Sequence, residues 1–152
     1  MKPYAFSRVN EKDQKMFSQI KKIISRMPEV DLKLDNSGQK RLVSCHTLAR
    51  AIATFFPMKV HDGYFFKSAY HHSWLTTKSC LIDVYPIAVI GGPILIDSTC
   101  FTPWSSQYVD QDIAINAQDE RFLDDVKKIV AAIDLTIKKL KIKVILPRDF
   151  EI

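Results

Sequence analysis

Residues 72–86 of this chain read HSWLTTKSCLIDVYP and predict two antiparallel strands joined by a tight turn. Aromatic and branched apolar residues, which favour strands, lie on both sides of a polar segment at residues 76–79. A turn over this segment places His72 directly opposite Asp83. Opposite residues share a face of the sheet, so we expect their side chains to hydrogen-bond, whereas a slip of one residue would turn Asp83 to the other face.

A buried helix is predicted upstream of this hairpin. Ser44 is a favourable N-cap, and residues 45–56 are apolar on nearly every side until Pro57. Such a helix should be central, with Cys45 in its first turn. Further elements are predicted after it, in this order: a strand at residues 58–61, a turn at 61–63, and strands at 63–69 and 94–97.

The two ends of the chain are predicted to be mainly helical. Apolar side chains recur at helical spacing within residues 9–27 and again over residues 119–140, and a closing strand is expected at 142–146. We therefore expect one α+β domain over residues 1–152. Its core, which carries the candidate site, is expected to span residues 39–108.

The net charge of +5 comes from 22 lysine and arginine residues against 17 aspartate and glutamate residues. The basic excess lies within residues 1–41, where acidic groups are scattered among the basic ones. This pattern fits the solvated face of a helix, and no basic stripe with interleaved aromatic residues accompanies it. We therefore expect no nucleic-acid partner.

Targeting and redox features also limit the function. No apolar run approaches the roughly 20 residues of a membrane span, and the N-terminus lacks the apolar region of a signal peptide. The three cysteines lack CxxC spacing, and three cannot all pair within one chain. We expect no membrane association, a reducing compartment and a cytoplasmic location.

Three ionisable residues of the middle region form an ordered set. A thiol at a helix N-terminus, as at Cys45, has a lowered pKa because it faces free N–H groups and the positive end of the helix dipole. A neighbouring imidazole such as that of His72 can take the thiol proton. A carboxylate such as that of Asp83 can hold the imidazole in one tautomer. The set predicts nucleophilic catalysis by a cysteine.

The order of these motifs resembles a known superfamily. A cysteine at a helix start, then HSWL at residues 72–75 and IDVYP at 82–86, is similar to the papain-like cysteine enzymes, in particular their transglutaminase-like and bacterial peptidase branch. The resemblance covers roughly residues 39–108. It implies a fold in which a central buried helix carrying the cysteine packs on an antiparallel sheet carrying the histidine and the acid.

The resemblance also implies roles for individual residues. Cys45 would be the nucleophile, His72 the general base and acid, and Asp83 the residue that orients His72. Gln39, six residues before the cysteine, stands at the offset of the oxyanion-hole glutamine of papain-type enzymes, and the backbone N–H of Cys45 would be the second donor. The implied activity is that of a thiol-dependent hydrolase or acyltransferase on amide or ester bonds of a peptide, a protein or a small amide, without a cofactor.

Other interpretations stay open for several residues. Asp97 ends another strand before a threonine-containing segment and is an alternative third member of the triad. Trp74 is expected at the wall of the cleft, where it could contact substrate or shelter the His–Asp pair from water. The same fold could also be a non-catalytic module that binds a peptide or protein. A zinc site is a further alternative, although its four candidate ligands lack the paired spacing typical of zinc: Cys45, His46, His71 and His72.

Overall fold

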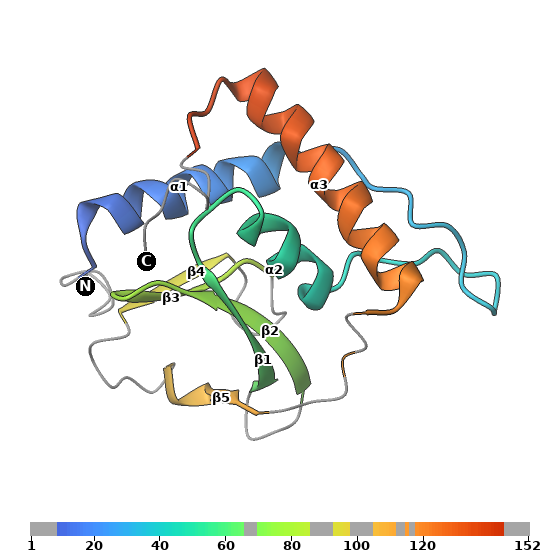
Figure 1. Cartoon of the computed structure of the whole chain (residues 1–152), viewed down its shortest axis with the longest axis horizontal. Helices are drawn as coiled ribbons and strands as arrows, with labels where there is room; N and C mark the ends of the chain where they lie inside the picture. The colour runs from blue at the N-terminus through green and yellow to red at the C-terminus, as the bar shows by residue number, and fades with distance from the viewer. Residues whose placement is uncertain are drawn as a thin grey trace.

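The computed structural model describes residues 9–65, 70–85, 93–97, 105–111, 115 and 118–144. Within these residues the chain is an α+β structure of three α-helices and one five-stranded antiparallel sheet, with the strand order β4-β3-β2-β1-β5. The helices cover one face of the sheet, and α2 lies between α3 and the strands (Figure 1). No helix in these described ranges is long and apolar enough to cross a membrane.

Helix α1, Glu11–Arg26, forms where the apolar spacing predicts it. The side chain of Asn10 caps its N-terminus by accepting a hydrogen bond from the N–H of Asp13. Its buried face packs into the main core through four apolar residues: Met16, Phe17, Ile20 and Ile23. The helix ends before Met27, whose extended conformation is the one favoured before a proline.

Helix α2, Cys45–Ala53, starts at the predicted residue and ends three residues earlier than predicted. The Oγ atom of Ser44 accepts the N–H of Thr47 at 3.2 Å, which satisfies one free donor of the first turn. Beyond Ala53 the backbone tightens, because the N–H groups of Thr54 and Phe55 bond to carbonyls three residues back. Most of the helix is buried, as its apolar sequence predicts.

Removal of this cap should destabilise the protein measurably. We expect Ser44→Ala to lower the free energy of unfolding by about 1 kcal/mol, because the N–H of Thr47 loses its partner. Urea denaturation measures the change. Ser25→Ala is a matched control, since the exposed Ser25 hydroxyl bonds to the carbonyl of Lys22 within its own helix and its removal should cost less than about 0.5 kcal/mol. Equal stability of both variants would contradict the capping role.

Helix α3, Glu120–Leu140, confirms the prediction for residues 119–140, with Asp119 as its N-cap. It ends at Lys141, which adopts a left-handed conformation (φ 53°) and lets the N–H of Ile142 bond back to Ile137. The predicted strand at 142–146 is absent over residues 142–144, of which Ile142 and Val144 pack against the core. Residues 145 and 146 lie outside the described residues.

The sheet differs from prediction in its first strand. The predicted turn at residues 61–63 is wrong, because β1 runs unbroken from Lys59 to Phe65 and pairs with β2 along its whole length. Gly63 marks instead the place where β5 crosses close to β1. Residues 66–69 of the predicted second strand lie outside the described residues. The other strands are β2 (Tyr70–Thr76), β3 (Cys80–Asp83), β4 (Ile94–Asp97) and β5 (Tyr108–Asp110), the last preceded by the short 3₁₀ helix η2 (Ser105–Gln107).

The hairpin between β2 and β3 exists, but its register is not the predicted one. Leu75 pairs with Ile82 and Thr76 with Leu81, so Asp83 is two positions away from direct opposition to His72. The turn is tighter than assumed, because the N–H of Thr77 bonds to the carbonyl of Cys80. A shift of two residues keeps every side chain on its predicted face. His72 and Asp83 therefore still lie on the same side of the sheet, as diagonal neighbours.

The two faces of the sheet have different surroundings. The face toward the helices carries apolar residues of the main core, such as Leu75 and Ile82. The other face carries a smaller buried cluster of Trp74, Leu81 and Ile96, against which the partly buried Tyr108 packs. Strand β5 lies on that side, opposite the helices, so the sheet curls around the smaller cluster (Figure 1). His72 and Asp83 point into this enclosed side.

Candidate active site

Cys45 is the first residue of α2, and only 8% of it is exposed. The N–H groups of the first helical turn have no carbonyl partner within the helix, which creates a positive environment at this end. Burial alone would raise the pKa of the thiol. Hydrogen bonds with His46 and His72, together with their charge, outweigh this effect and lower the pKa of Cys45 to about 6. The thiol is therefore a thiolate at neutral pH.

His72 lies between Cys45 and a buried carboxylate. Its Nε2 atom is 2.7 Å from Oδ2 of Asp83, which confirms the predicted contact, and its ring also hydrogen-bonds with Cys45. Burial alone would lower the pKa of the imidazole. The bonds with Asp83 and Cys45 reverse the direction and raise the pKa of His72 to about 9. Because Nε2 faces Asp83, Nδ1 is the nitrogen available to exchange a proton with the sulfur.

Asp83 is fully buried and accepts three hydrogen bonds. Besides His72, the Tyr108 hydroxyl donates to Oδ2 at 2.7 Å, and the backbone N–H of Tyr85 donates to Oδ1 at 3.1 Å. Burial and the neighbouring charge of Asp83 raise the pKa of Tyr108, which favours the protonated hydroxyl that donates to Asp83. Tyr108 was not singled out in the sequence, because its strand lies 25 residues from Asp83 and only the curl of the sheet brings them together.

Asp97 is excluded as the partner of His72. It is fully buried on β4, where it pairs with Cys80, and Cys80 belongs to the core on the helix side of the sheet. Cross-strand partners share a face, so Asp97 points toward the helices and His72 points the other way. Of these two carboxylates, Asp83 is the one that contacts His72.

Gln39 does not lie at the thiol. It is exposed, and its backbone N–H bonds to the Asp35 carboxylate in a turn closed by the bridge between Leu34 and Lys40. This hairpin projects from the body of the molecule, beyond the end of α3 (Figure 1). The offset of six residues was misleading because these residues close a turn of their own. Of the two oxyanion donors implied by the resemblance, the backbone N–H of Cys45 alone lies beside the sulfur.

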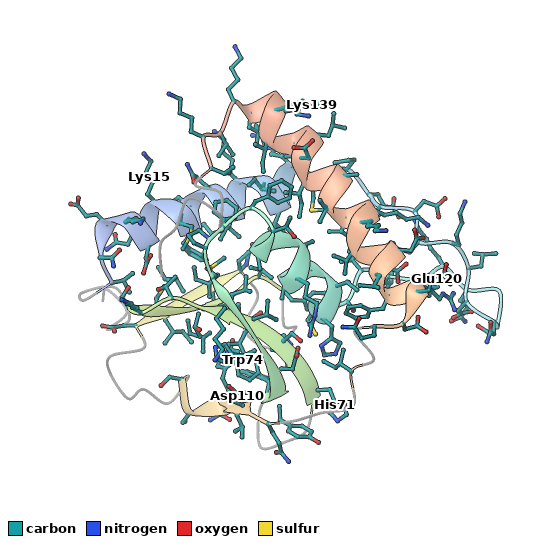
Figure 2. The ribbon with its side chains drawn as sticks, viewed as in Figure 1. Lys15, His71, Trp74, Asp110, Glu120 and Lys139 are labelled. Carbon is teal, nitrogen blue, oxygen red and sulfur yellow. The ribbon has the colours of Figure 1, made fainter. Side chains whose placement is uncertain are left out.

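Trp74 is 3% exposed and packs beside the His72–Asp83 pair. Its ring stacks on His72 at 6.4 Å between centroids and on His61 at 5.9 Å, and meets Tyr108 edge-on at 5.4 Å. Figure 2 shows Trp74 next to Asp110 of β5, on the side of the sheet away from the helices. This position agrees with a role in sheltering the His–Asp pair from water and leaves little surface for substrate.

The remaining histidines and cysteines occupy distinct places. His71 is exposed and packs edge-on against Tyr64, so it does not join Cys45 or His72. Cys80 is buried beside Asp13, and burial is the main reason why its pKa rises to about 11. Cys100 lies outside the described residues. Over the described ranges, no three His, Cys, Asp or Glu side chains gather as they would around a metal ion.

His46 lies at the candidate site, which its position in the sequence alone does not predict. It contacts Cys45, and its Nδ1 atom lies 2.6 Å from Ser73 Oγ. Ser73 in turn donates a hydrogen bond to Asp62, which also accepts one from Arg50. The place of His46 directly after the cysteine was the only signal in the sequence. The partners that orient it come from β1 and β2, which local patterns could not predict.

Comparison with known proteins adds no assignment: no family model, curated protein or solved structure matches this chain. Inference about its function therefore depends on the geometry around Cys45.

Proposed function

We propose that this protein is a papain-like cysteine hydrolase or acyltransferase that acts on amide or ester bonds. The observation that carries the proposal is the position of His72, which bonds to the buried Asp83 through Nε2 and to Cys45 at the helix start. With a thiol pKa of about 6 and an imidazole pKa of about 9, thiolate and imidazolium coexist across neutral pH. This state is the one that nucleophilic cysteine catalysis needs.

The first half of the proposed reaction forms an acyl-enzyme. The Cys45 thiolate attacks the carbonyl carbon, a C–S bond forms, and the carbonyl electron pair moves onto oxygen, toward the N–H of Cys45. The oxyanion then collapses, the C–N or C–O bond breaks, and the imidazolium of His72 gives its proton to the leaving amine or alkoxide. A thioester on Cys45 and a neutral His72 remain.

The second half releases the acyl group. Neutral His72 takes a proton from water, or from an acceptor amine or alcohol, as that molecule attacks the thioester carbonyl. The C–S bond breaks and returns the thiolate, while His72 is again an imidazolium held by Asp83. Water as the acceptor makes the enzyme a hydrolase, and an amine or alcohol makes it an acyltransferase. Substrates of this class include peptides, proteins and small amides, and a thiolate nucleophile suits the reducing cytoplasm.

Alkylation by iodoacetamide tests the proposal without knowledge of the substrate. We expect the rate of Cys45 alkylation to rise with pH around a midpoint of about 6, as the thiolate forms. Peptide mapping by mass spectrometry identifies the modified residue, and Cys45→Ala should remove the reaction. Cys80 is the internal control, because a pKa of about 11 keeps it protonated and unreactive over the same range. A Cys45 midpoint at or above about 8.5, the value of a free thiol, contradicts the proposal.

A second candidate is a non-catalytic module that binds a peptide or protein. The low exposure of Cys45 (8%) and His72 (4%) favours it, since a substrate carbonyl must reach the sulfur. The same experiment separates the two functions. Fast alkylation of Cys45 at mildly acidic pH requires both access and a thiolate, whereas a closed site would leave Cys45 unmodified until the protein unfolds.

A further inference from the structure

A second imidazole, that of His46, lies against Cys45 at the end of a chain of hydrogen bonds that the proposed reaction does not use. Nδ1 of His46 is 2.6 Å from Oγ of Ser73, and Ser73 donates to Oδ1 of Asp62 at 2.5 Å. Arg50 holds both oxygens of that carboxylate, at 3.0 and 2.7 Å. The chain therefore runs from His46 through Ser73 and Asp62 to Arg50.

The direction of these hydrogen bonds makes Nδ1 of His46 a donor. The Ser73 hydroxyl has a single hydrogen, which it gives to Asp62, so its oxygen accepts the Nδ1–H of His46. Burial alone would raise the pKa of Asp62, but the bonds from Arg50 and Ser73 lower it, and the carboxylate stays ionised. With Nδ1 bonded to Ser73, Nε2 is the ring nitrogen of His46 left to meet Cys45.

The same contacts hold the ring in place. Ser73 is fully buried on β2, where it follows His72 and points to the opposite face. Arg50, one turn after His46 on α2, also donates to the His46 carbonyl at 3.1 Å and lies over the Phe122 ring of α3 at 5.4 Å. Two consecutive residues of α2 are thus tied to two consecutive residues of β2, Cys45 to His72 and His46 to Ser73.

We propose that His46 is a second positioning residue of the reactive thiol, held against Cys45 by the hydrogen-bond chain through Ser73, Asp62 and Arg50. This inference rests on the proposed function, because it assigns a role within the same site. The imidazoles of His46 and His72 have different roles. His46 stabilises the charge of the sulfur, and His72 exchanges protons with the leaving group and with water.

The pH profile of Cys45 alkylation by iodoacetamide tests this role in three variants of the full chain: His46→Gln, Ser73→Ala and Asp62→Asn. We expect the alkylation midpoint to rise in each by about one pH unit, which slows alkylation about tenfold at acidic pH. His71→Gln is the matched control. His71 is an exposed histidine of β2, the strand that carries Ser73, and its replacement should leave the midpoint unchanged. A purely structural role of His46 would change the unfolding free energy without moving this midpoint.

The possible outcomes separate the two proposals. A wild-type midpoint near 6 that persists in folded His46→Gln and Asp62→Asn overturns the inference and leaves the proposed function intact. A wild-type midpoint at or above about 8.5 overturns both. Ser73 is fully buried, so a Ser73→Ala protein that does not fold would give no midpoint. Asp62 is partly exposed, so the Asp62→Asn variant provides the midpoint in that case, and circular dichroism verifies its fold.

Discussion

Replacement of His72 by alanine should lower the turnover of p-nitrophenyl acetate by about 10²–10⁴-fold at neutral pH, the range expected when a general acid–base is removed. This ester acylates thiolates directly, so its hydrolysis reports on the site without knowledge of the natural substrate. The loss has two sources. Cys45 loses one of the two imidazoles that lower its pKa, and the thioester loses the base that activates water.

The pH profile distinguishes this mechanism from a general loss of structure. Wild-type turnover should be bell-shaped, with limbs at about 6 and about 9. The pKa of Cys45 is lowered, so the thiolate is lost as pH falls through about 6. The pKa of His72 is raised, so the imidazolium is lost as pH rises through about 9. The alkaline limb should vanish in His72→Ala, and a bell that persists in this variant would contradict the assignment.

Asp83→Asn is a milder change than His72→Ala, because it keeps the imidazole and removes only the negative charge beside it. Asparagine has nearly the same shape and can still accept a hydrogen bond, but it removes the charge that raises the pKa of His72. We expect the alkaline limb of turnover to move downward from about 9, while Cys45 remains open to alkylation. Thermal unfolding followed by circular dichroism checks that the buried substitution leaves the protein folded. An alkaline limb that stays at about 9 would mean that Asp83 does not raise the pKa of His72.

Features set by local sequence were predictable here. The starts of α2 and α3 follow from Ser44 and Asp119, because a capping side chain acts on N–H groups only two or three residues away. The face shared by His72 and Asp83 was predictable for a similar reason. Side chains alternate strictly along a strand, so an error of two residues in register left the prediction of the shared face correct.

Features set by distant contacts were not predictable. The β2–β3 turn is held by Asp13 of α1, which accepts hydrogen bonds from Thr77 and Ser79, more than sixty residues away. No local pattern in residues 76–79 carries that information, and the assumed turn was too wide. The partners of the site, Tyr108 for Asp83 and Ser73 for His46, likewise depend on how the sheet curls and where α2 docks.

Gly63 lies where the curled sheet brings β5 against β1, so a larger side chain there should destabilise the protein. We expect Gly63→Ala to lower the free energy of unfolding by about 3 kcal/mol, the upper part of the range for overpacking a filled site. A Cβ atom at this position would lie 2.0 Å from the Val109 carbonyl oxygen, 2.9 Å from the Gln111 nitrogen and 2.9 Å from the Trp74 ring. Two of these atoms are backbone of β5 and the residue after it, so the strand itself must move.

Urea denaturation of Gly63→Ala beside Gly38→Ala measures this effect against a matched substitution. Gly38 has open space around it and a φ of 82°, so alanine there suffers only backbone strain of about 1–2 kcal/mol. Displacement of β5 should also withdraw the Tyr108 hydroxyl from Asp83, a contact that Tyr108→Phe removes without any clash. Since His72 depends on Asp83, turnover should fall further in Gly63→Ala than in Tyr108→Phe. If Gly63→Ala were as stable as the wild type, β5 would not close the sheet over the His72–Asp83 pair.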